Sequence, residues 1–285
     1  MHAGRWLALA LLVTAVAAAV YLGALSNDDD GVLWKADAER SASAEWASSR
    51  ADPPGPQPCP GSTPPDRAAP KIRRVTSPVA QGRYAYSITV APGDDCHGER
   101  AELGQGNPSR PGFENRVFED GDERWISFQV RLGADFDTSV DTWRVIAQFH
   151  EPGGDYGTPA LSLQVEGGDF VLYRADKNVV SEDTVELWRT PAVKDRWVRF
   201  TLHVKFSPDP HTGFLELFGN PAGGPVHQLL RKRATFTMRK GPGGRGAPLH
   251  ARIGIYRDPE GHFGTETVYF DGYTVAKSRA AAEGD

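Results

Sequence analysis

The feature that most constrains this chain is an alternation of apolar and polar residues in short runs between about residues 75 and 278. Residues 126–132, 161–165 and 198–206 place Ile, Leu, Val or Phe at every second position, and Gly, Pro, Asp and Asn separate such runs. A period of two is typical of strands with one buried face. No window of helical length carries a sustained apolar stripe. The sequence therefore predicts an all-β, jelly-roll sandwich of two antiparallel sheets.

The first 26 residues have the pattern of an export signal. Arg5 is followed by an uncharged run from Trp6 to Leu25, and Ala24 and Ser26 are small residues at the spacing that a signal peptidase accepts. The same run, as an uncleaved hydrophobic helix, has about the length needed to span a bilayer. Both alternatives place the rest of the chain outside the cytoplasm, either secreted or anchored to the outer face of the cytoplasmic membrane.

Residues 27–74 are predicted to be a disordered linker, because Ala, Ser, Asp and a crowd of prolines leave too few apolar residues for a core. The folded domain is expected over residues 75–278, with a short tail at 279–285. The chain has two cysteines, Cys59 and Cys96. In an oxidising compartment they are expected to form one disulfide, and two unrelated thiols are the alternative.

The formal net charge of −5 gives no reason to expect nucleic-acid binding. One segment departs from this acidic balance, between Gln228 and His250. It contains six basic residues and no acidic ones: Arg231, Lys232, Arg233, Arg239, Lys240 and Arg245. Such a segment is either a basic lip that attracts an anionic polymer or an ordinary solvated loop. Nothing in the sequence indicates an oligomer, so we expect a monomer.

Residues 144–150, with the sequence Arg-Val-Ile-Ala-Gln-Phe-His, form the most informative segment. As a regular strand it places Val145 on one face with Ala147 and Phe149, and Ile146 on the other with Gln148 and His150. An amide can donate to a carboxylate, and an imidazole can move a proton near neutral pH. Taken alone, the pair is more often a solvated strand face.

Two further segments carry comparable patterns. In residues 250–257, Ile253 and Ile255 predict a core face, while Arg252 and Tyr256 point the other way with Gly254 leaving room for a ligand between them. In residues 98–103, Arg100 and Glu102 share a face. Arg100 either faces a substrate carboxylate or forms a surface salt bridge of small energetic value.

The three segments in this order, Arg-Ala-Glu-Leu, Gln-Phe-His and Arg-Ile-Gly-Ile-Tyr-Arg, resemble the jelly-roll polysaccharide lyases. The resemblance covers about residues 75–278, including the closing run 269–275, and implies a concanavalin-like fold. It is closest to the heparin lyase I-like and glucuronan lyase group. Alginate lyases, with Arg-Ser-Glu-Leu, Gln-Ile-His and Lys-Ala-Gly-x-Tyr motifs, look more distant.

The resemblance implies β-elimination at a uronic acid of an anionic polysaccharide, glucuronan or heparin/heparan in type. Gln148 would neutralise the uronate carboxylate, and His150 and Tyr256 would be the catalytic histidine and tyrosine. Arg100 and Arg252 would bind substrate. Arg252 stands where several relatives have lysine, which keeps the charge but removes a side chain able to titrate.

The remaining candidate site residues are Glu102, His203 and Asp271. Glu102 and His203 are placed with the substrate-binding residues, although His203 on a polar strand face is equally consistent with simple solvation. No cofactor is needed for the chemistry, and Asp271 is a candidate ligand of a structural Ca²⁺, although one carboxylate is weak support for a site of 6–8 oxygens. The alternative functions are a non-catalytic glycan-binding module of the same fold and, less favoured, a glycoside hydrolase using acids of the run 119–123.

Overall fold

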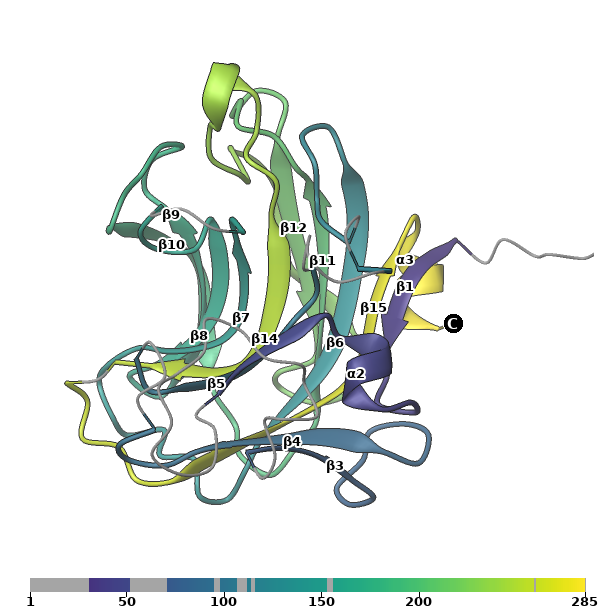
Figure 1. Ribbon diagram of the computed structural model, residues 1–285, viewed down its shortest axis with the longest axis vertical. Coiled ribbons are helices and arrows are strands. Elements are labelled where there is room, and N and C mark those ends of the chain that lie inside the picture. The colour runs from purple at the N-terminus through teal and green to yellow at the C-terminus, as the bar shows by residue number, and fades with distance from the viewer. Residues whose placement is uncertain are drawn as a thin grey trace, which may run out of the picture. The chain divides into compact units, whose positions relative to one another are not determined.

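The computed structural model describes residues 31–51, 71–94, 98–106, 112–113, 116–152, 156–258 and 260–284. Over these residues two antiparallel sheets pack face to face, and the only helical segments described are short (Figure 1). They are α2 (Ala42–Glu45), the 3₁₀ turn η2 (Pro242–Gly244) and α3 (Arg279–Glu283). The predicted two-sheet sandwich is confirmed, and its arrangement is consistent with a jelly roll. None of the described helices is long and apolar enough to cross a membrane.

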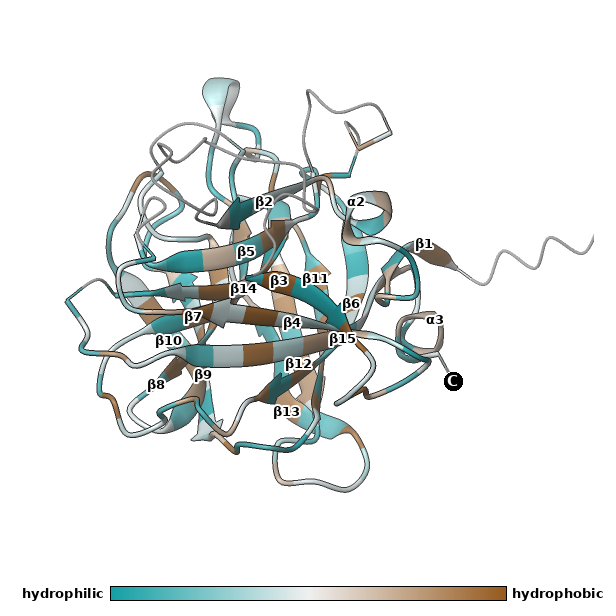
Figure 2. Ribbon diagram, turned by 60° about the horizontal axis from the view of Figure 1, so that its bottom comes forward, coloured by the Kyte–Doolittle hydropathy of each residue, from teal (hydrophilic) through white to brown (hydrophobic). Residues whose placement is uncertain are grey.

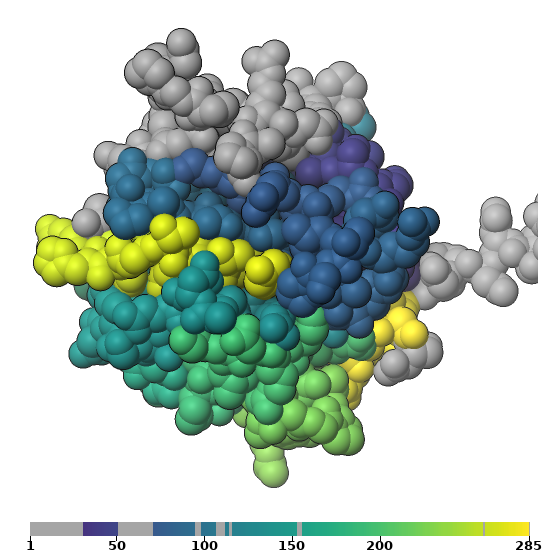
Figure 3. All heavy atoms as spheres, turned by 90° about the horizontal axis from the view of Figure 1, so that it is seen from below, coloured from purple at the N-terminus to yellow at the C-terminus, as the bar shows by residue number. Residues whose placement is uncertain are grey.

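The first sheet has eight strands. Seven of them follow in the order β13 (His227–Ala234), β12 (Phe214–Gly219), β11 (Val198–Lys205), β6 (Glu123–Leu132), β15 (Glu266–Ala276), β4 (Ala85–Val90) and β3 (Ile72–Val75). The eighth, β1 (Val32–Ala36), pairs with β15 beyond the end of its ladder with β4. Strands far apart in sequence therefore lie side by side, as where the yellow C-terminal part of the chain borders the blue part that contains β4 (Figure 3). Glu266 at the start of β15 faces Val90 of β4.

The second sheet has seven strands. They follow in the order β10 (Thr184–Pro191), β9 (Asp169–Ala175), β8 (Leu161–Glu166), β7 (Arg144–His150), β14 (His250–Arg257), β5 (Arg100–Gly104) and β2 (Ser48–Ala51). All three segments that carry the lyase-like motifs are strands of this sheet. They are also neighbours, because β14 pairs with β7 on one side and with β5 on the other.

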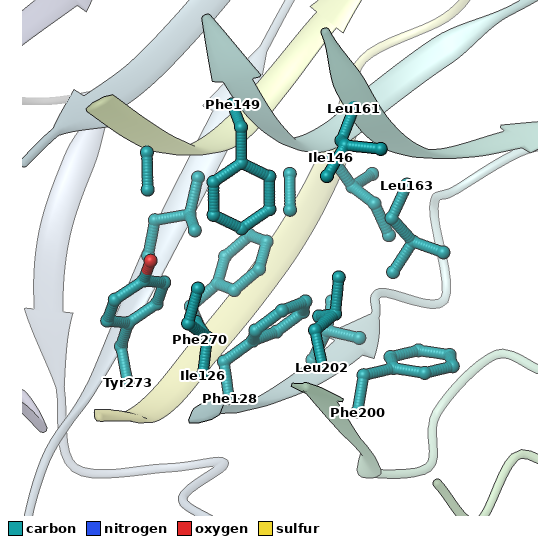
Figure 4. Close-up of a cluster of buried hydrophobic side chains, with 14 of the residues drawn as sticks. Ile126, Phe128, Ile146, Phe149, Leu161, Leu163, Phe200, Leu202, Phe270 and Tyr273 are labelled. Carbon is teal, nitrogen blue, oxygen red and sulfur yellow. The ribbon is translucent and has the colours of Figure 1, made fainter. Parts of the chain in front are cut away.

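The core fills the space between the two sheets. Phe149, Leu161 and Leu163 of the seven-stranded sheet point toward Phe128 and Leu202 of the eight-stranded sheet (Figure 4). Hydrophilic and hydrophobic bands alternate along the strands (Figure 2). The predicted inner faces of residues 126–132, 161–165 and 198–206 are all buried. Burial of these apolar side chains on one face of each strand is the main force that fixes the two layers.

One strand departs from strict alternation. The pairing of β7 with β8 shifts register between Val145 and Ala147, which marks a bulge or irregularity. Ile146 belongs to the core together with Ala147 and Phe149, whereas Val145 lines the cleft on the outer face. The prediction that Val145 shares the face of Ala147 is therefore wrong. A bulge places an extra residue in one strand and moves the side chains before it to the opposite face.

The predicted linker over residues 27–74 is wrong wherever the structure describes it. Residues 32–51 contain β1, α2 and β2, which pair with both sheets, and β3 begins at Ile72. Trp34 and Trp46 are buried with Tyr273, at ring-centroid separations of 4.9–5.2 Å. A few large aromatic side chains supply enough apolar area to fold a segment that is otherwise poor in apolar residues.

A buried carboxylate strengthens this N-terminal attachment. Glu45 accepts hydrogen bonds from the Tyr86 hydroxyl at 2.6 Å and from the backbone amides of Ala38 and Arg40. The expected tail also packs on the domain over its described part, because Ala282 is buried and the Glu283 carbonyl accepts from Arg199. The folded unit thus begins earlier and ends later than the predicted range 75–278. The export signal, the proline-rich stretch 53–65, Cys59 and Cys96 lie outside the described residues.

Candidate functional site

A cleft of about 550 Å³ lies on the outer face of the seven-stranded sheet. Its lining includes Arg100, Gln148, His150, Arg252 and Tyr256, and the strand order explains why. Arg252 is directly opposite Gln148 in the ladder of β14 and β7, and Tyr256 is directly opposite Arg100 in the ladder of β14 and β5. Cross-strand partners share a face at short range. Strand pairing therefore brings all the principal motif residues onto one surface.

The floor of the cleft is a compact cluster of charge. Glu102 accepts a hydrogen bond from the Gln148 amide, and its other oxygen lies 3.7 Å from the Arg100 guanidinium. Arg50 of β2 is directly opposite Glu102 in the ladder, and Arg252 lies on the next strand. Three arginines therefore surround one carboxylate. The floor carries an excess of positive charge in an otherwise acidic chain.

The floor charges are buried but incompletely paired. Arg100 and Arg252 are 7% and 8% exposed, and Glu102 is 1% exposed. Among the described residues, the Arg100 Nε, the Arg252 Nη1 and one Glu102 oxygen have no hydrogen-bond partner. Leaving buried donors unpaired is costly, so such atoms mark a place where a ligand completes the network.

Electrostatics point to the same ligand charge. Burial, together with the positive charges of Arg50 and Arg100, lowers the pKa of Arg252 to about 10 against the opposing effect of Glu102. Burial and the charge of Arg100 likewise lower the pKa of Arg50. The arginines destabilise one another's charged form. A bound anion would relieve that repulsion, which makes the floor an anion-binding surface.

Tyr256 is held by three neighbours. The Arg100 guanidinium lies 3.6 Å from the centre of its ring, and the Trp143 ring meets it edge-on at 4.9 Å. A Cβ placed on Gly98 would come within 2.8 Å of the ring, and Gly98 has φ +87°. Packing therefore fixes the tyrosine beside the floor arginines. The position of Gly98 requires glycine both for its backbone angle and for this close approach.

His150 lies between two loop carbonyls. Its Nδ1 is 2.9 Å from the Glu151 carbonyl and its Nε2 is 3.3 Å from the Gly157 carbonyl. Glu151 is itself buried and paired with Arg239. These contacts orient the imidazole at the cleft, next to Gln148 and on the same face. His150 and Tyr256 thus come from adjacent strands and both line the cleft.

A second histidine lies directly beside the first. His250 is the cross-strand partner of His150, is 3% exposed, and has no hydrogen-bond partner for either ring nitrogen among the described residues. Burial and the nearby charges of Arg252 and His150 lower the pKa of His250 to about 2. The sequence prediction missed it. Its position two residues before Arg252, on the same face by alternation, was the available signal.

Arg50 and Trp143 are cleft residues that also escaped the sequence prediction. Arg50 lies within the segment assigned to the linker, and Trp143 immediately precedes β7. Trp34 and Trp46 were the signals that residues 31–51 fold, since exposed linkers rarely carry tryptophan. Without the correct fold of this segment, Arg50 could not be placed opposite Glu102.

Gly254 has a different role from the predicted one. Its φ is +150°, and a Cβ there would lie 2.1 Å from the Ala101 carbonyl oxygen and 2.7 Å from the Glu102 Cα. The missing side chain therefore accommodates the neighbouring backbone of β5. It brings β5 close to β14, which helps to place Glu102 and Arg252 on one floor.

His203 does not belong to this site. It lies on β11 of the eight-stranded sheet, stacks on Trp125 at 4.0 Å, and bonds to Glu216 and Glu123 at 2.6 and 3.0 Å. The prediction that His203 binds substrate in the cleft is wrong. Alternation correctly placed it on a polar outer face, but that face belongs to the other sheet.

The basic segment does not act as one lip. Arg231, Lys232 and Arg233 are exposed on β13, at the edge of the eight-stranded sheet. Arg239 is fully buried, pairs with Glu151 at 3.3 Å and donates to the carbonyls of Val179 and Ser181. No residue of the segment lines the described cleft. Its charges are divided between a solvated edge and a structural ion pair.

Asp271 closes a loop. Its buried carboxylate accepts the amides of Ala80 and Gln81 at 2.9 and 3.0 Å through one oxygen, and its other oxygen has no partner among the described residues. Burial raises its pKa to about 6. No group of three or more His, Cys, Asp or Glu that could hold a metal occurs in the described ranges. This setting fits a loop-closing carboxylate better than a Ca²⁺ ligand.

The chain is similar to known proteins over most of its length. The profile of a family described as "Polysaccharide lyase" matches residues 38–274. A search of the curated proteins finds no match. Among solved structures, the endo-β-1,4-glucuronan lyase of the fungus Trichoderma reesei has a TM-score of 0.55 at 16% identity, covering 83% of this chain and 98% of that one.

Two other structures share the fold. The PL-14 alginate lyase of Aplysia kurodai has a TM-score of 0.50 at 13% identity, covering 81% of this chain and 98% of that one. The catalytic domain of a glycoside hydrolase family 131 protein from Coprinopsis cinerea has a TM-score of 0.52 at 10% identity, covering 87% and 95%. At these identities the likeness concerns the fold alone.

Proposed function

Because the chain belongs to the polysaccharide lyase family, and is therefore a carbon–oxygen lyase, we propose that it cleaves a uronic-acid-containing glycan of glucuronan or heparin/heparan type by β-elimination. The single observation that carries this proposal is the cleft floor, where Arg50, Arg100, Arg252 and Gln148 gather beside His150 and Tyr256. An anion-binding floor next to two proton-transfer groups is the combination that this reaction requires.

The floor performs the electrostatic part of the reaction. The proton at C5 of a uronate is weakly acidic while the adjacent carboxylate keeps its charge. Arg252 and Arg100 would bind that carboxylate, and the second N–H of Gln148 would donate to it, since the first is held by Glu102. These preorganised donors stabilise the enolate-like intermediate, which is usually the largest catalytic contribution.

His150 and Tyr256 supply the proton transfers. A base removes the C5 proton, the C4–O bond breaks as the C4–C5 double bond forms, and the departing glycosidic oxygen takes a proton. Tyr256 is the natural acid because Arg100 and Trp143 hold its ring beside the floor. The base is either His150 or Tyr256 itself. Each transfer contributes roughly 10²–10⁴-fold.

The experiment is a substrate panel of glucuronan, heparin, heparan sulfate and alginate, followed by ultraviolet absorbance. β-Elimination leaves a C4–C5 unsaturated uronate that absorbs, whereas hydrolysis leaves a saturated end. Gln148→Ala removes a carboxylate donor, so we expect KM to rise and kcat to fall on the cleaved polymer. Reducing ends without absorbance would indicate a hydrolase, and binding without any product would indicate a non-catalytic glycan-binding module. Either result would refute the proposal.

The N-terminal sequence supports a proposal about where the protein acts. An exported enzyme, secreted or held at the outer face of the cytoplasmic membrane through residues 6–25, would meet polysaccharides directly. We propose that it acts as a monomer on an anionic polysaccharide, with no nucleic-acid partner and no cofactor in the chemistry. Non-reducing mass spectrometry of secreted material tests the Cys59–Cys96 disulfide, which two free thiols would contradict.

A further inference from the structure

The cleft carries opposite charge at its two ends. In the order of the sheet, Arg50 lies on β2, Arg100 on β5 and Arg252 on β14. On the other side of β7 the cleft is lined by Glu166 at the end of β8 and Glu182 just before β10. His150 on β7 lies between the two ends, and Tyr256 lies on β14 within the basic end. A glycan that crosses the strands through the reacting groups therefore passes from a basic to an acidic environment.

Within the described residues, neither carboxylate of the acidic end is held in an ion pair. Glu166 accepts a hydrogen bond from the Tyr173 hydroxyl at 2.5 Å. Burial, and then this bond to Glu166, raise the pKa of Tyr173, so its hydroxyl remains a neutral donor. The nearest guanidinium on β10, Arg189, is bound to Glu186 and Asp169 instead. Among the described residues that line this end there is no lysine or arginine.

Glu151, the third carboxylate that lines the cleft, does not change this separation of basic and acidic ends. Glu151 is buried and paired with Arg239, so the two charges largely cancel. Four strand steps separate Arg50 on β2 from β8, and two separate Arg252 on β14 from β8, about 19 Å and about 10 Å at the usual strand spacing. Both distances exceed the Debye length of about 8 Å at physiological ionic strength. The two ends therefore act on different sugars of one chain rather than cancelling each other.

From this arrangement we infer that the cleft selects a glycan in which a uronate alternates with a sugar that carries no anionic group. The uronate binds at the β2–β5–β14 end, and the sugar at the β8–β10 end is one without carboxylate or sulfate. A homopolymer of uronate would place a carboxylate at the β8–β10 end, close to Glu166 or to Glu182, where like charges repel. This inference rests on the proposed function and refines its substrate class.

The test compares kcat/KM on two unsulfated polymers, a glucuronate homopolymer and a polymer that alternates glucuronate with N-acetylglucosamine. We expect the wild-type protein to prefer the alternating polymer. In the double variant Glu166→Gln/Glu182→Gln, the ratio of homopolymer to alternating-polymer kcat/KM should rise roughly fivefold, a modest factor because these charges are partly exposed. The rise should be present at about 0.01 M salt and lost near 1 M, where the Debye length is about 3 Å.

A matched control removes a carboxylate outside the cleft. Glu123→Gln alters the outer face of the eight-stranded sheet and should leave the ratio at its wild-type value. If the double variant gains equally on both polymers, or not at all, the charge selection is refuted while the lyase proposal stands. If neither polymer is cleaved, calorimetric affinities of the same proteins for the two polymers decide. Equal affinities of the wild-type protein for both would overturn the inference.

Discussion

Strands β7 and β14 carry two buried polar regions that differ in how their charges are paired. Near one end of the strands, Arg144 and Arg257 are cross-strand partners, and Arg257 pairs with Glu99 at 2.6 Å and Glu266 at 3.2 Å. In the middle, Gln148 and Arg252 are cross-strand partners, and Arg252 has no salt bridge in the described part of the chain. Arg257 and Arg252 are both buried.

This difference separates structural from functional charge. The paired region ties loops together, since Arg144 donates to the carbonyls of Asp137 and Val140 and Arg257 donates to that of Gly264. The unpaired region faces the cleft and leaves donors open to a ligand. A buried charge without a partner lowers stability, so its presence on the cleft floor is explained by what it binds.

The largest expected effect comes from removing each arginine in turn. Arg257→Met leaves Glu99 and Glu266 without their partner and should lower the free energy of unfolding by about 3–5 kcal/mol. Arg252→Met removes an unpaired buried charge, so stability should hold or rise while kcat/KM falls at least tenfold. Urea denaturation and steady-state kinetics measure the two. Equal loss of stability in both variants would remove the distinction between the regions.

A second comparison uses two tyrosine hydroxyls. Tyr256→Phe keeps the ring between Arg100 and Trp143 but removes the proposed proton donor, so kcat should fall at least about 10²-fold with little change in stability. Tyr86→Phe removes the hydroxyl that donates to buried Glu45 and should cost about 1–3 kcal/mol of stability without altering kcat. Full activity in Tyr256→Phe would leave His150 as the remaining named candidate for proton transfer.

A third prediction concerns pH and the buried His250. The pKa of His250 is lowered to about 2 in the folded protein, by burial and by Arg252, His150 and Arg50, and lies near 6.5 when unfolded. Between these two pKa values His250 binds a proton in the unfolded chain but not in the folded chain. The free energy of unfolding therefore falls as pH drops below about 6.5. Between pH 7 and pH 5 the loss should be about 2 kcal/mol.

The midpoints of urea unfolding at pH 7 and pH 5 measure this slope of stability against pH. His250→Gln should flatten it, because the variant has no imidazole to protonate on unfolding. The exposed variant His211→Gln keeps His250 and serves as the matched control, with a slope like that of the wild type. An unchanged slope in His250→Gln would show that His250 is not the group responsible.

The smallest effect is expected at Asp271, outside the cleft. Its pKa is raised to about 6, above the unfolded value of 3.8, so the stability of its protonated form is lost as pH rises through about 6. Asp271→Asn removes that loss and keeps an acceptor for Ala80 and Gln81, so above pH 6 it should gain about 1 kcal/mol. If added Ca²⁺ instead raises the Tm of the wild type but not of the variant, Asp271 is a calcium ligand.

The alternation of residues was sufficient to predict much of this molecule. It predicts two packed sheets and the polar faces of Gln148, His150, Arg252 and Tyr256, because the direction of a side chain in a strand follows from its position in the chain. The same rule predicts that Arg100 and Glu102 share a face. These are local properties, and the structure confirms the shared faces of all six residues.

The tertiary structure decided what depends on non-local pairing. Alternation shows that His203 points outward but not from which sheet, and it cannot foresee the shift in β7 that turns Val145 into the cleft. Composition placed Arg50 in a linker, whereas pairing of β2 with β5 sets it opposite Glu102. Sequence alone therefore determined which side chains share a face where a strand keeps its regular alternation. The partners of each strand, and hence the charge pattern of the cleft, were decided by burial of apolar surface between segments far apart in the chain.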